Sequence, residues 1–406
     1  MRVARAWLRR GCALALLASL ASCGGGGGGG SSAPPEPPVL AANQMLITIE
    51  QNPAVSVART VNVPYVTLKV CDATGQCADI DHVVLDTGSY GLRLLQSAVT
   101  AAGLKLPADT DSSGNRYGEC VKFLSGYMWG SVSHATLQLG AGTTTPLPLQ
   151  VAGASDVAQL KDQCSVMGGV DAGTASVLQA NGLLGIGAFN HDLGSYYSCP
   201  ANATTCTALT SVPVAEQVVN PVPLITNSSY TNGIILQLPA VPETGAGRTY
   251  GTLTFGVDTE ANNAISNFAP IPLDSKGFLT VAVDGSSYSA SFLDSGSNYY
   301  FAPPLAGTVA TDAQGNFIPP SLLSLPLSLS ANTAGASSSV AAQMLLWNYA
   351  SMNFALYSAF NDIGSATDLG LSGIDLGLPF FYGRQVAYVI SGHSSSLGPG
   401  PLVALH

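Results

Sequence analysis

A short motif occurs twice in this chain, and the two copies lie far apart. Residues 83–89 read Val-Val-Leu-Asp-Thr-Gly-Ser, and residues 291–297 read Ser-Phe-Leu-Asp-Ser-Gly-Ser. A second element follows each copy in the same order, Gly-Leu-Leu-Gly-Ile-Gly at residues 182–187 and Ile-Asp-Leu-Gly-Leu at residues 374–378. A single Asp-Ser/Thr-Gly is also typical of a polar turn. Two copies of both elements in the same order indicate instead a fold built from two related halves.

The composition favours an all-β fold. Of the 406 residues, 47% are apolar and only 9% are charged, which is enough apolar material for a large core. The 45 Gly and 25 Pro residues are spread along the chain and favour many short strands joined by turns. Apolar runs at residues 280–283 and 386–390 predict strands. Helices should be few and short, with residues 92–102 and 351–360 as candidates.

The N-terminus has the pattern of an export signal. Four arginines precede an apolar stretch at residues 12–20 that is too short to span a bilayer. These arginines are Arg2, Arg5, Arg9 and Arg10. The stretch ends in Leu-Ala-Ser-Cys at residues 20–23, which resembles the lipobox of bacterial lipoproteins. That resemblance implies a signal peptide at residues 1–22 and a lipid on Cys23. The alternative is an ordinary signal peptide followed by an incidental cysteine.

The segment that begins at Cys23 predicts a flexible tether over residues 23–43. Residues 24–30 are all Gly, and a run rich in Ser and Pro follows them, a composition that does not form a packed core. Gly24 stands where an Asp is often associated with retention in the inner membrane. We therefore expect an exported protein anchored in the outer membrane, on its periplasmic face or at the cell surface.

The charge balance argues against a nucleic-acid partner. The chain carries 14 basic and 24 acidic residues, a formal net charge of −10, and removal of a signal peptide with four arginines makes it more acidic still. Such a surface repels a phosphate backbone, and the sequence has no basic patch to override it.

The cysteines predict disulfides. Eight are present, and setting aside Cys12 and the lipidated Cys23 leaves an even number in an exported protein. These are Cys71, Cys77, Cys120, Cys164, Cys199 and Cys206. The first two and the last two are each close in sequence, and the middle two remain as a third pair, although other connectivities are possible. No metal site is expected, because the histidines do not group with the cysteines at ligand spacing. The histidines are His82, His134, His191, His393 and His406.

On these motifs the chain resembles the pepsin-like aspartic proteases, in a divergent bacterial lipoprotein branch, and the likeness covers most of residues 60–390. Residues 63–69 are similar to the hairpin before the family's first Asp motif, and residues 251–258 to a strand that crosses between its lobes. The resemblance implies an all-β, two-lobed fold with few short helices and lobes related by a pseudo-twofold axis. The lobes are expected at residues 44–262 and 263–406.

The resemblance implies that Asp86 and Asp294 form a catalytic pair. Two carboxyls held close together cannot both ionise readily, because each charge raises the pKa of the other group, so they share a proton. The pair then presents a base and an acid to one water molecule, which is what peptide hydrolysis requires without a metal or a nucleophilic side chain.

The residues after each Asp are expected to support the pair. The hydroxyl residue would hydrogen-bond across the lobe interface, the Gly would let backbone N–H groups approach the carboxylates, and the Ser would donate to an outer carboxylate oxygen. In the first copy these residues are Thr87, Gly88 and Ser89, and in the second they are Ser295, Gly296 and Ser297.

The resemblance places the flap, the hairpin that covers the cleft, within residues 120–129. Tyr127 is expected to lie over the pair, with Phe123 as the alternative, unless both aromatics simply pack within the hairpin. Where the family commonly has Trp, residues 90–93 read Tyr-Gly-Leu-Arg. Because an unpaired buried guanidinium is costly, Arg93 either reaches solvent or meets an acidic partner. We favour a surface arginine.

Together these features predict an exported, lipid-anchored aspartic endopeptidase that acts on a peptide or protein substrate. It would need no cofactor and would be a monomer. The alternative is a non-catalytic surface lipoprotein that uses the same fold to bind a peptide, a glycan or a protein. In neither motif is the Asp or one of its neighbours replaced, which favours the enzyme.

Overall fold

The computed structural model describes residues 35–52, 60–157, 164, 169–201, 203–305, 309–332, 339–366 and 372–406. Residues 35–406 belong to one compact unit. The predicted signal peptide, Cys23 and most of the tether lie outside the described residues. None of the helices in the described ranges is long and apolar enough to cross a membrane.

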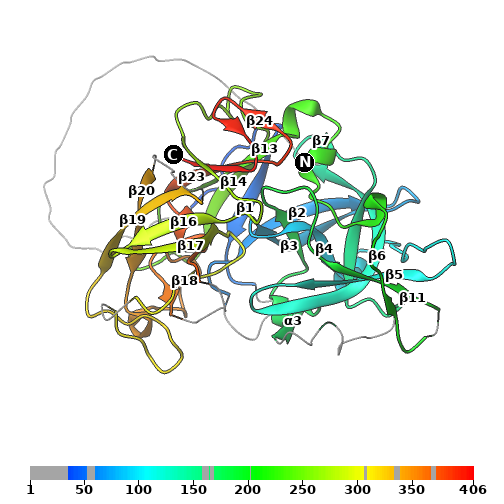
Figure 1. Cartoon of the computed structure of the whole chain (residues 1–406), viewed down its shortest axis with the longest axis horizontal. Coiled ribbons are helices and arrows are strands. Elements are labelled where there is room, and N and C mark those ends of the chain that lie inside the picture. The colour runs from blue at the N-terminus through cyan, green and yellow to red at the C-terminus, as the bar shows by residue number, and fades with distance from the viewer. Residues whose placement is uncertain are drawn as a thin grey trace, which may run out of the picture. The chain divides into compact units, whose positions relative to one another are not determined.

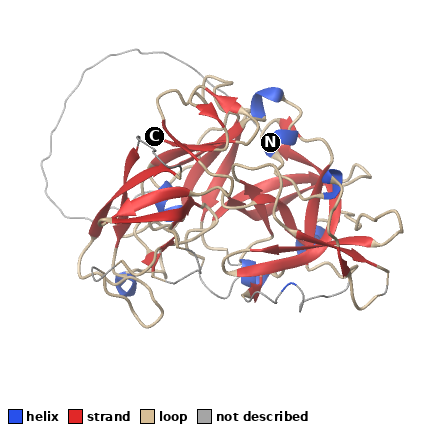
Figure 2. Cartoon of the chain, viewed as in Figure 1, coloured by secondary structure: helices blue, strands red, loops and turns tan. Residues whose placement is uncertain are grey.

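Strands dominate the described chain (Figure 2). They are β1 Gln44–Ile49, β2 Pro64–Cys71, β3 Cys77–Asp86, β4 Tyr90–Leu95, β5 Arg116–Lys122, β6 Gly126–Leu139, β7 Gly142–Thr143, β8 Leu147–Ala152, β9 Val170–Asp171, β10 Gly182–Ile186, β11 Ser195–Cys199, β12 Thr207–Ala208, β13 Gly233–Leu238, β14 Thr249–Phe255, β15 Ala269–Pro272, β16 Leu279–Val283, β17 Ser286–Leu293, β18 Tyr300–Phe301, β19 Leu323–Ala331, β20 Ser339–Leu346, β21 Gly364–Ser365, β22 Asp375–Leu376, β23 Arg384–Val389, β24 Ser394–Ser395, β25 Gly398–Pro399 and β26 Leu402–Leu405.

Helices are few and short. The α-helices of the described residues are α1 Gln96–Ala101 and α3 Ala175–Leu178, and the 3-10 turns are η1 Val214–Glu216, η2 Val222–Leu224, η3 Ser228–Tyr230, η4 Tyr349–Ser351 and η5 Leu378–Phe381. The predicted all-β class is confirmed, and so is a short helix within residues 92–102. The predicted helix at residues 351–360 is wrong, because after η4 the chain runs through turns that pack aromatic rings such as Phe354 and Phe360 against each other.

The strands form a large sheet, a smaller one, and a two-stranded sheet of β24 and β25 (Figure 1). The smaller sheet has the order β20-β19-β16-β17-β22-β18-β21. The large sheet contains β1 to β15 and is completed by two strands from the end of the chain, since β23 pairs with β13 and β26 pairs with β15. The C-terminal segment is therefore part of the sheet of the first half. A lobe boundary at residues 262 and 263 stays a prediction.

The repeated motifs have the same strand pairing in both halves. In the first half, β10 runs parallel to β3, with Gly185 opposite Asp86, and antiparallel to β4. In the second half, β22 runs parallel to β17 and antiparallel to β18. In each half, the strand that carries the second repeated element thus lies between the strand that leads into the Asp motif and the strand that follows the motif. The internal repeat of the sequence is a repeat of the topology.

The apolar residues before each Asp are buried because their strands lie inside the sheets. Val83, Leu85 and Leu184 are buried completely, and Leu293 and Leu376 belong to the same apolar cluster. A continuous apolar run is what a parallel strand covered on both faces requires. The packing of these apolar residues in the core therefore fixes the position of both Asp motifs.

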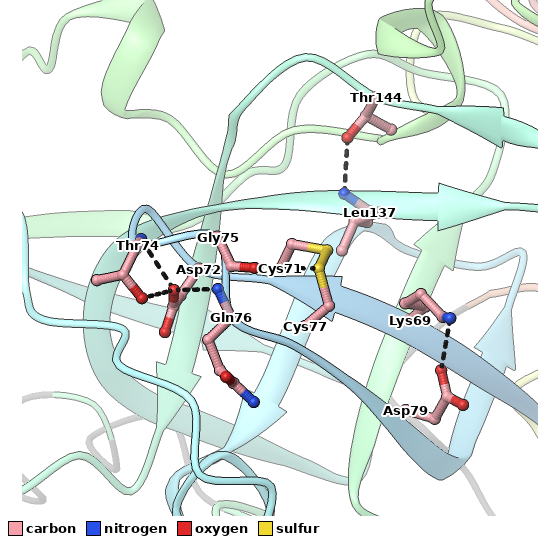
Figure 3. Close-up of a disulfide and its surroundings, with 10 residues drawn as sticks. All are labelled: Lys69, Cys71, Asp72, Thr74, Gly75, Gln76, Cys77, Asp79, Leu137 and Thr144. Carbon is pink, nitrogen blue, oxygen red and sulfur yellow. Dashed lines mark hydrogen bonds and ion pairs between the residues drawn. A yellow bond between two sulfur atoms is a disulfide. The ribbon is translucent and has the colours of Figure 1, made fainter.

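All three predicted disulfides are present: Cys71–Cys77, Cys120–Cys164 and Cys199–Cys206. The first closes the β2–β3 hairpin, whose turn is organised by the carboxylate of Asp72 (Figure 3). Asp72 Oδ1 accepts the Thr74 N–H at 2.9 Å, the Thr74 hydroxyl at 2.6 Å and the Gln76 N–H at 3.1 Å. These bonds hold the pKa of Asp72 below its ordinary value.

Candidate active site

Asp86 is the last residue of β3, and Asp294 directly follows β17. The structure brings these two carboxyls together from the two halves of the chain. The approach is reciprocal, since a Cβ added to Gly88 would lie 2.5 Å from Asp294 Cγ, and one added to Gly296 would lie 2.8 Å from Asp86 Cγ. Because real Cβ atoms do not approach other atoms this closely, only Gly fits next to the opposite carboxyl.

Reciprocal hydrogen bonds join the two loops behind the carboxyls. The Thr87 N–H donates to Ser295 Oγ at 3.1 Å, and the Ser295 N–H donates to Thr87 Oγ1 at 3.0 Å. The Ser295 hydroxyl also donates to the Leu85 carbonyl at 2.7 Å. Thr87 and Ser295 are both buried, so these bonds are shielded from water and fix the separation of the loops.

Each carboxyl accepts the same two bonds from its own loop. Asp86 Oδ1 accepts the Gly88 N–H at 2.8 Å, and its Oδ2 accepts the Ser89 hydroxyl at 2.5 Å. Asp294 Oδ1 accepts the Gly296 N–H at 2.7 Å, and its Oδ2 lies 2.9 Å from Ser297 Oγ. Each donor lies only two or three residues after its Asp, so the motif itself supplies these hydrogen bonds.

The environment favours a proton on Asp86. Burial raises the pKa of Asp86 well above its ordinary value of 3.8, and the charge of Asp294 and a hydrogen bond with its carboxyl raise it further. Asp86 is only 5% exposed, whereas Asp294 is half-buried. Asp86 is thus a carboxyl that burial and its neighbour make readily neutral.

Two tyrosines near the pair were not anticipated from the sequence. Tyr388 on β23 is buried, and its Oη lies 3.1 Å from both Thr87 Oγ1 and the Leu293 carbonyl, so it braces the joined loops. Burial, followed by the charges of Asp86 and Asp294, raises the pKa of Tyr90. The position of Tyr90 directly after the first motif could have indicated that it lies near the pair. Tyr388 lies far along the chain from both motifs, so its position carried no such indication.

A third carboxyl was also missed. Asp375 on β22 is 2% exposed, and its Oδ2 lies 2.5 Å from Ser297 Oγ, the hydroxyl that also contacts Asp294. Burial and then the charge of Asp294 raise the pKa of Asp375 well above its ordinary value. The signal was visible, because an Asp stands in the second copy of the apolar element, where the first copy has Leu183.

Both carboxyls of the pair open onto a cavity of about 700 Å³ lined by residues of both halves. Phe123 and Leu124 line it from the hairpin of β5 and β6, and Phe278 and Phe292 line it from the second half. A mostly apolar cleft with a few convergent polar groups is typical of a ligand-binding site.

The hairpin differs from the expectation for Tyr127. Phe123 is among the described residues that line the cavity, whereas Tyr127 is not and is buried in the core cluster. Tyr127 pairs with Lys122 across the hairpin, and its neighbour Met128 faces the cavity instead. Successive strand residues point to opposite faces, so the register places Tyr127 on the core side. Phe123, the alternative candidate, is the aromatic at the cavity.

The interpretation of Arg93 as a surface residue is wrong. Its side chain is 1% exposed, and its Nη2 donates to Glu119 Oε1 at 3.0 Å and to Asp192 Oδ2 at 2.5 Å. Nη1 donates to the Tyr90 carbonyl at 2.9 Å. The guanidinium therefore ties the strand after the first motif to β5 of the hairpin and to the loop after β10. Burial and the charge of Asp192 raise the pKa of Glu119 well above its ordinary value, although Arg93 opposes this.

A separate polar cluster contains His134. Asp109, His134 and Glu216 each offer an atom within 4.8 Å of the others, and all three are partly exposed. Both ring nitrogens of His134 already have partners, since Nδ1 lies 2.6 Å from Asp109 Oδ2 and Nε2 lies 3.1 Å from the Ala215 carbonyl. The bond with Asp109 raises the pKa of His134, as an imidazolium held between two acceptors requires.

Comparisons with known proteins relate the chain to one family. No curated protein matches the sequence. Among solved structures, an aspartic proteinase from Irpex lacteus is similar at 16% identity and a TM-score of 0.48, over 90% of this chain and 97% of that one. The assignment to the pepsin-like fold rests on the repeated strand pairing and the joined Asp loops. A model described as "Protein of unknown function (DUF3443)" matches residues 39–405. The chain therefore belongs to the DUF3443 family.

Proposed function

We propose that this protein is an aspartic endopeptidase that hydrolyses peptide bonds with a water molecule activated between Asp86 and Asp294. The observation that carries the proposal is the reciprocal approach of the two loops, in which each Gly lies against the opposite carboxyl. An incidental pair of polar turns has no reason to exclude side chains at both positions, or to exchange hydrogen bonds between Thr87 and Ser295.

The chemistry follows from one proton on the pair. The ionised carboxyl accepts a proton from the water as its oxygen attacks the peptide carbonyl carbon, and the neutral carboxyl donates its proton to the carbonyl oxygen. When the tetrahedral intermediate collapses, one of its hydroxyl groups gives a proton to the carboxyl that is now ionised. The carboxyl that took the proton from water donates that proton to the leaving amine. The products are a carboxylic acid and an amine, and the pair again holds one proton.

The test uses residues 31–406, which contain the compact unit, and a denatured protein substrate at mildly acidic pH. Asp86→Asn or Asp294→Asn alone is expected to reduce the cleavage rate by at least about 100-fold, because each removes an acid or a base. The two neutral amides are close in shape to the carboxyls, so folding should survive. Cleavage at the wild-type rate in either variant would rule out the mechanism.

A binding experiment separates this proposal from a non-catalytic module for peptides, glycans or proteins. A peptide inhibitor that mimics the tetrahedral intermediate should raise the Tm of the wild type more than that of Asp294→Asn. An enzyme with one narrow target would bind the inhibitor yet fail a general cleavage assay. No shift in Tm together with no cleavage would favour the non-catalytic module.

We also propose that the enzyme is exported and anchored to the outer membrane through a lipid on Cys23. The support is the lipobox-like sequence at residues 20–23 and the Gly-, Ser- and Pro-rich segment that follows it. Cells fed a labelled fatty acid should incorporate the label into the wild-type protein but not into Cys23→Ser. Equal labelling of both would overturn the anchor at this position.

A further inference from the structure

The two halves of the site differ in the residue that stands beside each Asp motif on the strand of the second repeated element. In the first half, Val84 lies two residues before Asp86 and pairs with Leu183. In the second half, Phe292 lies two residues before Asp294 and pairs with Asp375. The second half therefore buries a carboxyl where the first half has an isobutyl side chain, directly behind the catalytic loop.

The Ser297 hydroxyl lies between the carboxyls of Asp294 and Asp375 and cannot donate to both. Ser297 Oγ lies 2.9 Å from Asp294 Oδ2 and 2.5 Å from Asp375 Oδ2, but it carries only one hydrogen. If both carboxyls were ionised, one of these contacts would oppose two lone pairs with no hydrogen between them. One of the two carboxyls must therefore supply a proton to the hydroxyl oxygen.

The burial of the two groups decides which carboxyl holds that proton. Asp375 is 2% exposed, and its Oδ1 has no hydrogen-bond partner among the described residues. The titratable groups that act on it, Asp294 and Asp86, are both acidic, so within the described part of the chain no positive charge compensates an ionised Asp375. Asp294 is half-buried, and its Oδ1 accepts the Gly296 N–H. A neutral Asp375 and an ionised Asp294 are the state with the smaller desolvation cost.

We propose that Asp375 is a positioning residue that stays protonated and donates to Ser297 Oγ, so that the Ser297 hydroxyl donates to Asp294 and keeps Asp294 the ionised member of the pair. Asp86 then holds the shared proton. The consequence for catalysis rests on the proposed peptidase function, whereas the proton on Asp375 does not. Ser297 is thus the middle of a short chain of hydrogen bonds that has no counterpart behind Asp86.

The proton on Asp375 can be measured without any substrate. Infrared difference spectroscopy between the wild type and Asp375→Asn near neutral pH should show the loss of one carbonyl band of a protonated carboxyl. Loss of an ionised carboxylate band instead would overturn the proposal. Because this readout is independent of cleavage, it separates a failure of the inference from a failure of the peptidase function.

The effect on the pair is measured in the pH profile of kcat/KM. Asp375→Leu gives the second half the residue of the first, and the acid limb should move up by about 0.5 to 1 pH unit, because nothing then holds the Ser297 hydroxyl in the orientation in which it donates to Asp294. Asp375→Asn should restore the limb, since its Nδ2–H can donate to Ser297 Oγ. An Asn variant whose limb moves to lower pH would mean that Asp375 is ionised, and would overturn the proposal.

A double-variant experiment tests whether Asp375 acts through Ser297. In a Ser297→Ala background the hydroxyl is absent, so Asp375→Leu should no longer move the acid limb. A shift of equal size in that background would show that Asp375 acts by charge or packing alone. If Asp375→Leu does not fold, as judged by its Tm, the infrared and kinetic results for the Asn variant decide.

Discussion

The two Asp loops have the same contacts at their carboxyls and different side chains on the strands next to them. Arg93 pairs with Leu183 across β4 and β10, and the equivalent pair across β18 and β22 is Phe301 with Asp375. The first half thus buries an ionisable side chain on the strand after the motif, and the second half buries one on the strand that carries the second repeated element. The duplicated motif sets the symmetric contacts, whereas these flanking strands make the two members of the pair unequal.

The buried side chains of Arg93 and Asp375 are accommodated in different ways, one with charged partners and the other without. Arg93 meets two carboxylates, from Glu119 and Asp192, and forms a network that reaches the hairpin over the cavity. Among the residues that the structure describes, the polar groups that act on Asp375 are the Ser297 hydroxyl and two other acids. A charged network is stable in the first half because a cation is present, and a neutral acid is the state that burial favours in the second half.

The largest effect should follow the loss of the cation in the first half. Arg93→Met keeps much of the side-chain volume but leaves Glu119 and Asp192 buried without the cation that compensates their charge, which should lower the free energy of unfolding by about 3–5 kcal/mol near pH 7. The loss should be smaller near pH 4. An acid whose folded pKa is raised stabilises the folded state below its unfolded pKa, and that stability is lost as pH rises toward the folded pKa. Denaturant unfolding at the two pH values measures this.

Phe301→Met is the matched control for Arg93→Met. It makes a similar change at the equivalent, half-buried position of the second half, where no ion pair is present, and should cost about 1 kcal/mol at either pH. An Arg93→Met variant that is no less stable than this control, or that becomes more stable as pH rises, would contradict the charged network.

A smaller effect, on activity rather than folding, should follow substitution of the two glycines. Gly88→Ala and Gly296→Ala each force a methyl group against the opposite carboxyl, at 2.5 Å and 2.8 Å. The pair must then move apart, and a displacement of about 1 Å can reduce catalysis on the order of 100-fold. Cleavage rates should fall in both variants, and further in Gly88→Ala, where the approach is closer.

Gly75→Ala controls for a general effect of replacing glycine. Gly75 lies in the turn closed by Cys71 and Cys77, has a φ of 84°, and has nothing within 4 Å of an added Cβ. This variant should lower Tm slightly through backbone strain and leave the cleavage rate unchanged. If Gly88→Ala and Gly296→Ala behave in the same way as Gly75→Ala, the two carboxyls do not lie against these glycines.

The parts of the site that could be predicted depend on contacts within the motif. The bonds from Gly88 and Ser89 to Asp86 span two and three residues, so reading the motif was enough to anticipate them. The flap could not be predicted in the same way. A shift of one residue in a hairpin exchanges the two faces of a strand. In the register of this hairpin, the Tyr127 side chain packs in the core and the Phe123 side chain lines the cavity.

By itself, the sequence determined that the fold is duplicated, that it is built from strands, and which two acidic residues the duplication brings to equivalent positions. Only the tertiary structure decided that Arg93 is buried, because its partners Glu119 and Asp192 lie 26 and 99 residues away along the chain. It also placed Asp375, from the distant β22, against the hydroxyl of Ser297. The state of a buried charge depends on its neighbours in space, and a sequence lists only its neighbours along the chain.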